Sequence, residues 1–495
     1  MNPETDIQFD NSYARLPPQF YTRLLPVPVS GPAPIRVNHP LARMLGFDPQ
    51  WLESGTGVAF TAGNHVPESA DPVATVYAGH QVGGWNPQLG DGRAILLGEV
   101  IANDGGRYDV QLKGSGRTPY SRGGDGRAPL GPVLREYIVS EAMAVLGVPT
   151  TRALAAATTG EWVYREGRLP GAVLVRIAQS HIRIGTVQYF ASRQENESLE
   201  ALVDHVIDRH YPEARQADNP VLAMLDGIIA RQAALVAQWQ SLGFIHGVMN
   251  TDNMLLSGES VDYGPCAFMD EFDLGKVFSS IDHGGRYAYG NQPQIAHWNL
   301  SALTQALLPM LDDDPERALA SGQAAIDAFP GLFQAAYQSR MREKLGILTP
   351  KPGDLDLIQG LLDLMQAEHT DFTLTFRHLA DLVDPQSASG GGVSALMEFP
   401  ESFDHWLGRW RQRIDEESLD SPARQAAMYA ANPVYIPRNH LVEEAIVAAE
   451  THQDFGPFDT LVDLLARPFE YHPDQSRFAT PPLPGQVVRQ TFCGT

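Results

Sequence analysis

The chain has 495 residues, which is too long for a single hydrophobic core, so we expect roughly two to four structural units. Its formal net charge of −23 at pH 7 argues against nucleic acids and anionic membranes as partners, because both favour basic surfaces. No uncharged apolar run approaches the roughly 20 residues that span a bilayer, and the acidic, polar start is unlike a signal or transit peptide. We therefore expect a cytoplasmic protein with no nucleic-acid or membrane partner.

The first part of the chain is expected to be rich in strands. An irregular, Pro-rich stretch precedes a glycine-rich loop at residues 83–93, and a second glycine-rich loop occupies residues 114–126. Between the two loops, turn residues separate an apolar run from a segment that alternates polar and apolar residues, which predicts a β-hairpin that ends at Lys113. The expected elements are a strand at 94–101, a strand at 108–113, a helix at 132–146 and a strand at 171–178.

Beyond about residue 195 the pattern is mainly helical. A long helical pattern at 219–242 is followed by Gly243, and the Pro-rich tail at 476–495 is expected to be extended and poorly packed. A β-rich part with one helix, followed by a larger helical part, is the order of the two lobes of a protein kinase. The sequence therefore predicts an α+β, protein-kinase-like two-lobed fold with an additional helical C-terminal region. The expected divisions are an N-terminal extension (1–75), a kinase-like N-lobe (76–190), a kinase-like C-lobe core with catalytic and metal-binding loops (191–300), a helical C-terminal region (301–475) and an extended tail with Cys493 (476–495).

The most informative segment is His-Gly-Val-Met-Asn-Thr-Asp-Asn at 246–253, followed by Asp-Tyr-Gly at 262–264. In protein kinases an Asp two residues after the His accepts the proton of the substrate hydroxyl, and a later Asn and the Asp of Asp-Phe-Gly hold Mg²⁺. Here Asn253 and Asp262 stand at the two metal-ligand positions, whereas Val248 stands where the base is expected. The sequence therefore indicates a metal site without the usual proton acceptor.

Asp252 is the nearest carboxylate that could replace the missing base. The alternative is that it caps or orders the loop, as Asp residues commonly do. We favour the catalytic role. His246, in contrast, is expected to be a structural residue that is hydrogen-bonded to the backbone of the loop.

Lys113 and Glu136 have the spacing of a second kinase feature, in which a strand Lys touches the ATP phosphates and a helix Glu holds it. Glu141 on the same predicted helix is a weaker candidate for this partner. In the preceding loop, Gly90 and Gly92 could present backbone N–H groups to a phosphate, because glycine adopts the conformations that such a nest needs. Glycine loops are also common as plain turns, so this signal alone is weak.

Arg176 and Arg183 flank an apolar, strand-like region in an otherwise acidic chain. Arginine binds phosphate in a bidentate manner, but on spacing alone we prefer the interpretation that both side chains point to solvent or pair with carboxylates. The same alternative applies to Arg93. Neither a dinucleotide fingerprint nor a P-loop is present, because each candidate glycine segment lacks a required residue.

Nearly the whole chain resembles the selenoprotein O family of kinase-like proteins. Bacterial members of that family carry Cys near the C-terminus where eukaryotic members carry selenocysteine, and Cys493 stands in the matching place. The resemblance rests on Gly-Asp-Gly-Arg-Ala (90–94), Leu-Lys-Gly-Ser-Gly-Arg-Thr-Pro (112–119), the segment 246–253, Asp-Tyr-Gly-Pro (262–265), Asn-Pro-Val-Tyr-Ile-Pro-Arg-Asn-His (432–440) and Cys-Gly-Thr (493–495).

The resemblance implies an activity that composition could not show. Members bind ATP in a flipped orientation and transfer AMP to Ser, Thr or Tyr hydroxyls of protein substrates. ATP and Mg²⁺, or Mn²⁺ in its place, are the implied cofactors. Carried over by position, Asp252 would be the proton acceptor, and Asn253 and Asp262 would hold the metal ion, with Asp262 also in contact with the nucleotide. The other implied nucleotide-binding residues are Lys113, Arg176 and Arg183 at the phosphates, Glu136 as the partner of Lys113, and Gly90, Gly92, Arg93, Asp125 and Gly126 in the pocket.

Two further questions remain open at the level of sequence. Cys266 and Cys493 are the only two thiols, and our hypothesis is a reversible, activity-altering disulfide, with two free thiols as the alternative in a reducing cytoplasm. The preferred function is a protein adenylyltransferase. A kinase of proteins or small molecules, and a non-catalytic ATP-binding scaffold, are the alternatives.

Overall fold

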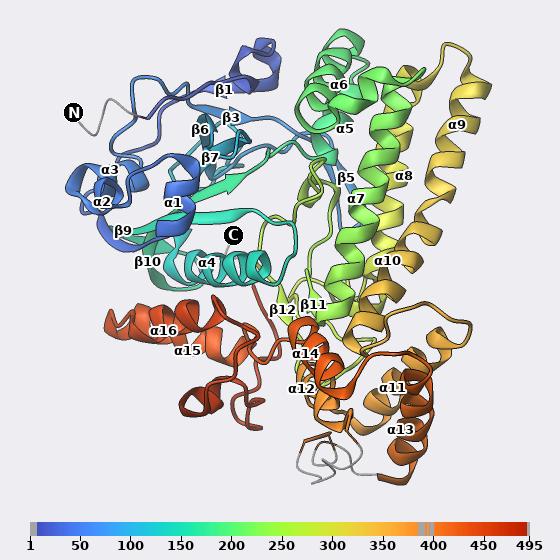
Figure 1. The fold of residues 1–495 in the computed structure, drawn as a ribbon. Helices are drawn as coiled ribbons and strands as arrows, with labels where there is room; N and C mark the ends of the chain where they lie inside the picture. The colour runs from blue at the N-terminus through green and yellow to red at the C-terminus, as the bar shows by residue number, and fades with distance from the viewer. Residues whose placement is uncertain (1–6, 385–391, 394–395, 397–399, 493–495) are drawn as a thin grey trace.

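A computed structural model describes residues 7–384, 392–393, 396 and 400–492 (Figure 1). Its centre is an eight-stranded antiparallel sheet with the strand order β1-β3-β6-β7-β10-β9-β2, in which β8 pairs with β10. The strands are β1 (Tyr21–Arg23), β2 (Ala33–Val37), β3 (Val73–Thr75), β6 (Ala94–Ile101), β7 (Arg107–Lys113), β8 (Ala128–Pro129), β9 (Arg152–Tyr164) and β10 (Arg168–Ala178).

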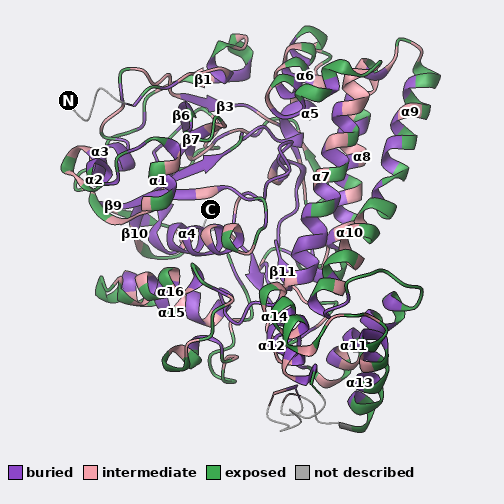
Figure 2. Ribbon diagram, viewed as in Figure 1, coloured by how far each residue is buried: buried purple, intermediate pink, exposed green. Residues whose placement is uncertain are grey.

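The predicted hairpin and the third predicted strand are confirmed as β6, β7 and β10. Leu174 of β10 lies opposite Lys113 of β7, and Arg176 follows two positions later on the same face. The predicted helix is α4 (Leu130–Val145), which packs on this face against β9 and β10. Three short helices cover the opposite face, α1 (His39–Leu45), α2 (Pro49–Glu53) and α3 (Gly55–Ala62). The sheet is therefore buried on both sides (Figure 2).

The N-terminal 75 residues are not the irregular stretch that the sequence predicted. They supply strands β1, β2 and β3 of the central sheet and the helices α1–α3 that pack on it. The 13-residue strand β9 was also not predicted, because its run of alanines has weak β-propensity. These residues therefore share the central sheet with the segments that follow them.

A layer of helices stands beside the sheet (Figure 1). Its long helix α7 (Pro220–Leu242) confirms the predicted pattern, with the side chain of Asn219 accepting from the N–H of Leu222 and Gly243 ending the helix at φ 70°. Among the described residues, α7 alone has the length and apolar composition of a membrane span, and half of that stretch is buried inside the protein. The neighbouring helices are α5 (Ile184–Ser192), α6 (Asn196–His210), α8 (Gln292–Leu311), α9 (Pro315–Asp327) and α10 (Phe329–Lys344).

The segment between α7 and α8 carries the kinase-like motif. It contains a two-stranded sheet of β11 (Phe244–Ile245) and β12 (Ala267–Phe268), and residues 244–262 are almost entirely buried. Loops usually run over the surface, so burial of this length indicates a segment held in place by its surroundings. A small hairpin, β4 (Gly79–Gln81) and β5 (Gly84–Asn86), lies against the same segment.

The remaining helices form two groups. The first packs around a core that includes Trp406 and Trp410 and that it shares with α10 and the segment of β11 and β12. The second packs on α4, which ties the C-terminal region back to the sheet. The first group is α11 (Asp354–Glu368), α12 (Phe372–Leu379), α13 (Pro400–Asp415) and α14 (Ser421–Ala431), and the second is α15 (Asn439–His452) and α16 (Gly456–Leu465).

The expectation of a poorly packed tail is wrong in two places. Residues Pro473–Phe478 form a short 3-10 helix, and Phe478 is buried against the core around α4. Further along, Thr491 donates from its N–H to the carbonyl of Phe278 at 2.8 Å and from Oγ1 to the carbonyl of Pro265 at 2.6 Å. The tail is thus anchored beside the segment that follows Asp262.

Candidate active site

One large cavity, of about 1320 Å³, brings together residues from the sheet, both glycine-rich loops and the segment 246–265. Every site residue implied by the family resemblance lies in its wall except Glu136, which is buried behind Lys113. The sequence did not predict Tyr77, Gln81 and Phe492, which also line it. Nothing in the local pattern marks these three residues, because they reach the cavity only through the folding of distant segments.

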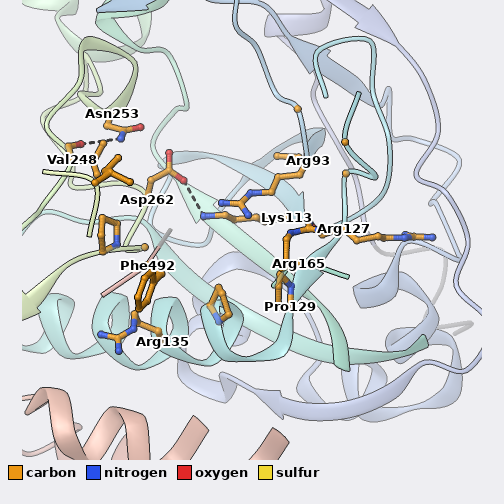
Figure 3. Close-up of a pocket in the computed structure, with 18 of the residues that line it drawn as sticks. Arg93, Lys113, Arg127, Pro129, Arg135, Arg165, Val248, Asn253, Asp262 and Phe492 are labelled. Carbon is orange, nitrogen blue, oxygen red and sulfur yellow. Dashed lines mark hydrogen bonds and ion pairs between the residues drawn. The ribbon is translucent and has the colours of Figure 1, made fainter. Parts of the chain in front are cut away.

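Asp262 is the centre of a cluster of charges at the cavity wall, and its side chain is 24% exposed. Its Oδ1 lies 3.0 Å from Lys113 Nζ and 2.6 Å from Arg176 Nη1, and its Oδ2 lies 2.7 Å from Arg183 Nη1. Figure 3 shows Lys113 pointing toward Asp262 in the cavity. Burial acts to raise the pKa of Asp262, but Arg176, Lys113 and Arg183 outweigh it and hold that pKa well below its usual range.

Glu136 is the second anion of the cluster. Its carboxylate lies 2.5 Å from Lys113 Nζ and 3.0 Å from Arg176 Nη1, so the expected Lys113–Glu136 ion pair is present. Burial again opposes ionisation, and Lys113 and Arg176 together lower the pKa of Glu136. Glu141 instead accepts from Arg152, away from the cavity, and is not the partner of Lys113.

Three cations and two carboxylates leave this cluster with one excess positive charge at the cavity wall. From spacing alone, Arg176 and Arg183 were expected to point to solvent or to pair with carboxylates, and the second of these is confirmed. Both arginines pair with carboxylates, but they do so inside the cavity and not in solvent. A buried cationic wall attracts anions, and planar guanidinium groups match phosphate in particular.

The loop at 246–253 is held by its own hydrogen bonds. His246 has the expected structural role, because its Nε2 lies 2.9 Å from the carbonyl oxygen of Val261 and its ring stacks on Trp239 at 5.4 Å. Asn253 Nδ2 donates to the carbonyl of Val248 at 2.9 Å, as Figure 3 shows. This bond leaves the amide oxygen of Asn253 as the atom that a cation can use.

Asp252 lies in the cavity wall next to Asn253. Arg183 donates to its backbone carbonyl, and Gln81 Nε2 donates to its Oδ2 at 3.1 Å. Within the described part of the chain, Asp252 Oδ1 is buried without a hydrogen-bond partner. Burial raises the pKa of the Asp252 carboxyl to about 6.

The two glycine-rich loops pack against each other at the cavity mouth. Gly90 has φ 140°, and a Cβ there would lie 2.5 Å from the ring of Tyr120. Gly126 has φ 69°, and a Cβ there would lie 2.0 Å from the carbonyl oxygen of Gly116. Asp125 orders this loop, because its carboxylate binds both terminal nitrogens of Arg165 at 3.0 Å.

The residues also suit a metal ion of the Mg²⁺ type. The amide oxygen of Asn253 and the carboxylate of Asp262 are hard oxygen donors, and Mg²⁺ commonly takes only one or two protein ligands in addition to substrate phosphates and water. Among the described residues no cluster of three or more His, Cys, Asp or Glu could hold a metal ion without such phosphates. The cysteine hypothesis is not addressed by the structure, because Cys266 is buried and Cys493 lies outside the described residues.

A cationic cavity of this size, with oxygen donors for a metal ion, is the kind of site found in enzymes that transfer part of a nucleotide. A family model described as "Protein adenylyltransferase SelO" matches residues 3–466 of the chain. The "Protein nucleotidyltransferase YdiU" of Rhodopseudomonas palustris (strain BisB5) is 57% identical to it, over 98% of this chain and 99% of the relative. Proteins of the same description from Methylorubrum extorquens and from a Bradyrhizobium species are 57% and 55% identical with the same coverage. The chain therefore belongs to the SelO family of protein adenylyltransferases, which confirms the resemblance and identifies it as a nucleotidyltransferase.

Proposed function

We propose that the chain transfers AMP from ATP to Ser, Thr or Tyr hydroxyls of protein substrates. One observation carries the proposal beyond family membership. Val248 fills the position of the kinase base, while Asp252 lies in the wall of the same cavity as the cation cluster. A proton acceptor displaced from the kinase position is consistent with attack on a different phosphorus atom of ATP.

The fold also supports a more specific proposal, that the enzyme has the two-lobed architecture of a protein kinase. The sheet with α1–α4 would be the N-lobe, and α5–α8, together with the segment 244–268, would be the core of the C-lobe. The helices from α9 onward would be the additional C-terminal region. The Lys113–Glu136 ion pair lies in the first part, and Asn253 and Asp262 lie in the second. The cavity between the two would take ATP in the flipped orientation, with its α-phosphate toward Asp252.

Each residue then has a definite task. Lys113, Arg176 and Arg183 would bind the β- and γ-phosphates and stabilise the negative charge that develops on pyrophosphate as it leaves. Asn253 and Asp262 would hold Mg²⁺, which when bound neutralises phosphate charge. Because Asp262 now binds all three cations, these side chains would shift from Asp262 to the phosphates when nucleotide enters.

Asp252 would act on the acceptor. Its carboxylate takes the proton of the substrate hydroxyl as the hydroxyl oxygen forms a bond to the α-phosphorus. The bond from that phosphorus to the bridging oxygen breaks, and pyrophosphate leaves with the electron pair. The products are an AMP–protein phosphodiester, pyrophosphate and the proton held by Asp252.

The position of the label distinguishes the candidate functions. The full chain is incubated with Mg²⁺, a desalted bacterial lysate as the source of acceptor proteins, and ATP labelled at either the α- or the γ-phosphate. We expect protein-bound label only from the α-position. Label only from the γ-position would identify a kinase, which the Lys113–Glu136 pair also suits, and no label from either would favour a scaffold.

Gly126→Ala tests the nucleotide-binding role of the second loop. A Cβ would lie 2.0 Å from the carbonyl oxygen of Gly116, so the loop must move away from its present course. We expect a loss of affinity for a non-hydrolysable ATP analogue with Mg²⁺ of about tenfold or more, measured by calorimetry. Gly123→Ala is the matched control, because φ is also positive there (85°) but nothing lies within 4 Å of the added Cβ. Equal affinities of the two variants would contradict the role of Gly126.

A further inference from the structure

The β4–β5 hairpin is bound to the loop that carries the proposed base. The N–H of His80 donates to Thr251 Oγ1 at 2.8 Å, and the N–H of Val82 donates to Asn250 Oδ1 at 3.0 Å. Two backbone groups of the hairpin are thus paired with two consecutive side chains of the loop, about 170 residues later in the chain. The hairpin and the loop therefore form one unit.

The backbone of the hairpin is strained at its turn. Val82 has φ 50°, which a β-branched residue rarely adopts, and Gly83 follows with φ 81°. Turns of this kind normally use Asn or Gly at the first position. Strain of this type persists only where surrounding contacts hold it, and it commonly lies at functional sites. The hydrogen bond from Val82 to Asn250 is such a contact.

Gln81 lies between these two backbone anchors and directs its amide into the cavity wall. Its Nε2 donates to Asp252 Oδ2 at 3.1 Å, and both residues line the cavity. The other oxygen, Oδ1, is covered, because a Cβ on Gly79 would lie only 2.6 Å from it. Oδ2 is therefore the oxygen that remains for a substrate hydroxyl, and it is the oxygen that Gln81 holds.

We propose that Gln81 is a positioning residue for AMP transfer, which orients the Asp252 carboxylate toward the acceptor hydroxyl. This inference rests on the proposed function. Arg183 fixes the backbone of Asp252, and Gln81 fixes the rotation of its side chain. A neutral amide is suited to this task because it donates a hydrogen bond without supplying a competing proton. A displacement of about 1 Å in a reacting group can reduce a rate about 100-fold, so a single orienting bond matters.

Gln81→Leu removes the donor and keeps much of the side-chain volume. We expect kcat for α-label incorporation to fall about 10- to 100-fold, while the KM for ATP stays within about twofold, because the structure places Gln81 against Asp252 and not within the cation cluster. Gln81→Glu, which has the same shape but places a carboxylate beside Asp252, should lose at least as much. Gln88→Leu is the matched control, because Gln88 is exposed just after β5 and lies outside the cavity wall.

The melting temperature and the affinity for a non-hydrolysable ATP analogue are measured for each variant. A fall in kcat with both of these unchanged supports positioning. A kcat of Gln81→Leu within twofold of wild type overturns the inference, and so does a loss that accompanies a lower melting temperature or weaker analogue binding. Wild-type protein is labelled in the same series, so failure of AMP transfer itself would be seen separately as the absence of α-label.

Discussion

Asp262→Asn is expected to reduce α-label incorporation on the order of 1000-fold. The substitution keeps the shape of the side chain but removes the negative charge that a metal ion needs. It also removes the anion that binds Lys113, Arg176 and Arg183 at 2.6–3.0 Å. Incorporation is measured at saturating ATP and Mg²⁺, and again with Mn²⁺.

The same variant should bind pyrophosphate more tightly than wild type when no metal ion is present. In the wild-type protein Asp262 competes with an incoming phosphate for three cations, and the variant lacks this competitor. Asp270→Asn is the matched control, because Asp270 is a similarly buried ion-paired carboxylate outside the cavity wall. Incorporation by Asp262→Asn within tenfold of wild type would contradict the metal-binding role, and unchanged affinity for pyrophosphate would contradict the competition.

Three strands of the sheet, β6, β7 and β10, could be predicted from sequence because their local signals were strong. β6 is an apolar run and β7 alternates in polarity, with a turn between them, and α7 begins after the capping Asn219 and ends at Gly243. The strands at the edges gave no such signal. β1 has three residues and β2 contains a proline, so neither shows a period long enough to detect. Only pairing with β3 and β9 makes them strands.

The candidate site was predictable where its residues lie in short motifs. The segment 246–253 and Asp262 match the order of residues in the protein-kinase motifs, so Val248 could be recognised as standing where a kinase has its catalytic Asp. The choice between Glu136 and Glu141 depended on which side of α4 faces the sheet near Lys113, which only the packing of the helix determines. No sequence pattern indicated Gln81, because its hydrogen bond to Asp252 joins two segments that meet only after folding.

Outside the active site, Lys344→Met is expected to stabilise the protein by roughly 2–4 kcal/mol at pH 7. Lys344 ends α10 and is 4% exposed, and its Nζ lies 4.5 Å from the centre of the Phe376 ring. No ion pair of Lys344 is present in the described ranges of the chain. Burial lowers the pKa of its ammonium group to about 7. Folding at neutral pH therefore requires either a buried charge or the loss of a proton.

The dependence on pH gives the sharper test, because its sign follows from the direction of the shift. Between pH 7 and the ordinary lysine pKa of about 10.4, the unfolded chain holds a proton that the folded chain has released. The free energy of unfolding of the wild type should therefore rise, relative to Lys344→Met, by about 1.4 kcal/mol per pH unit from pH 7 to 10. The destabilisation by Lys344 should be greatest below pH 7, where both states hold the proton. Urea unfolding of wild type and Lys344→Met at pH 7 and 9 measures this difference.

Lys351→Met is the control for a lysine at the surface. Lys351 is 40% exposed and paired with Glu416, so its substitution should change the free energy of unfolding by less than about 0.5 kcal/mol at either pH. Parallel pH profiles for wild type and Lys344→Met would show that Lys344 keeps its proton inside the folded protein, with the faces of Phe376 and Phe372 compensating its charge.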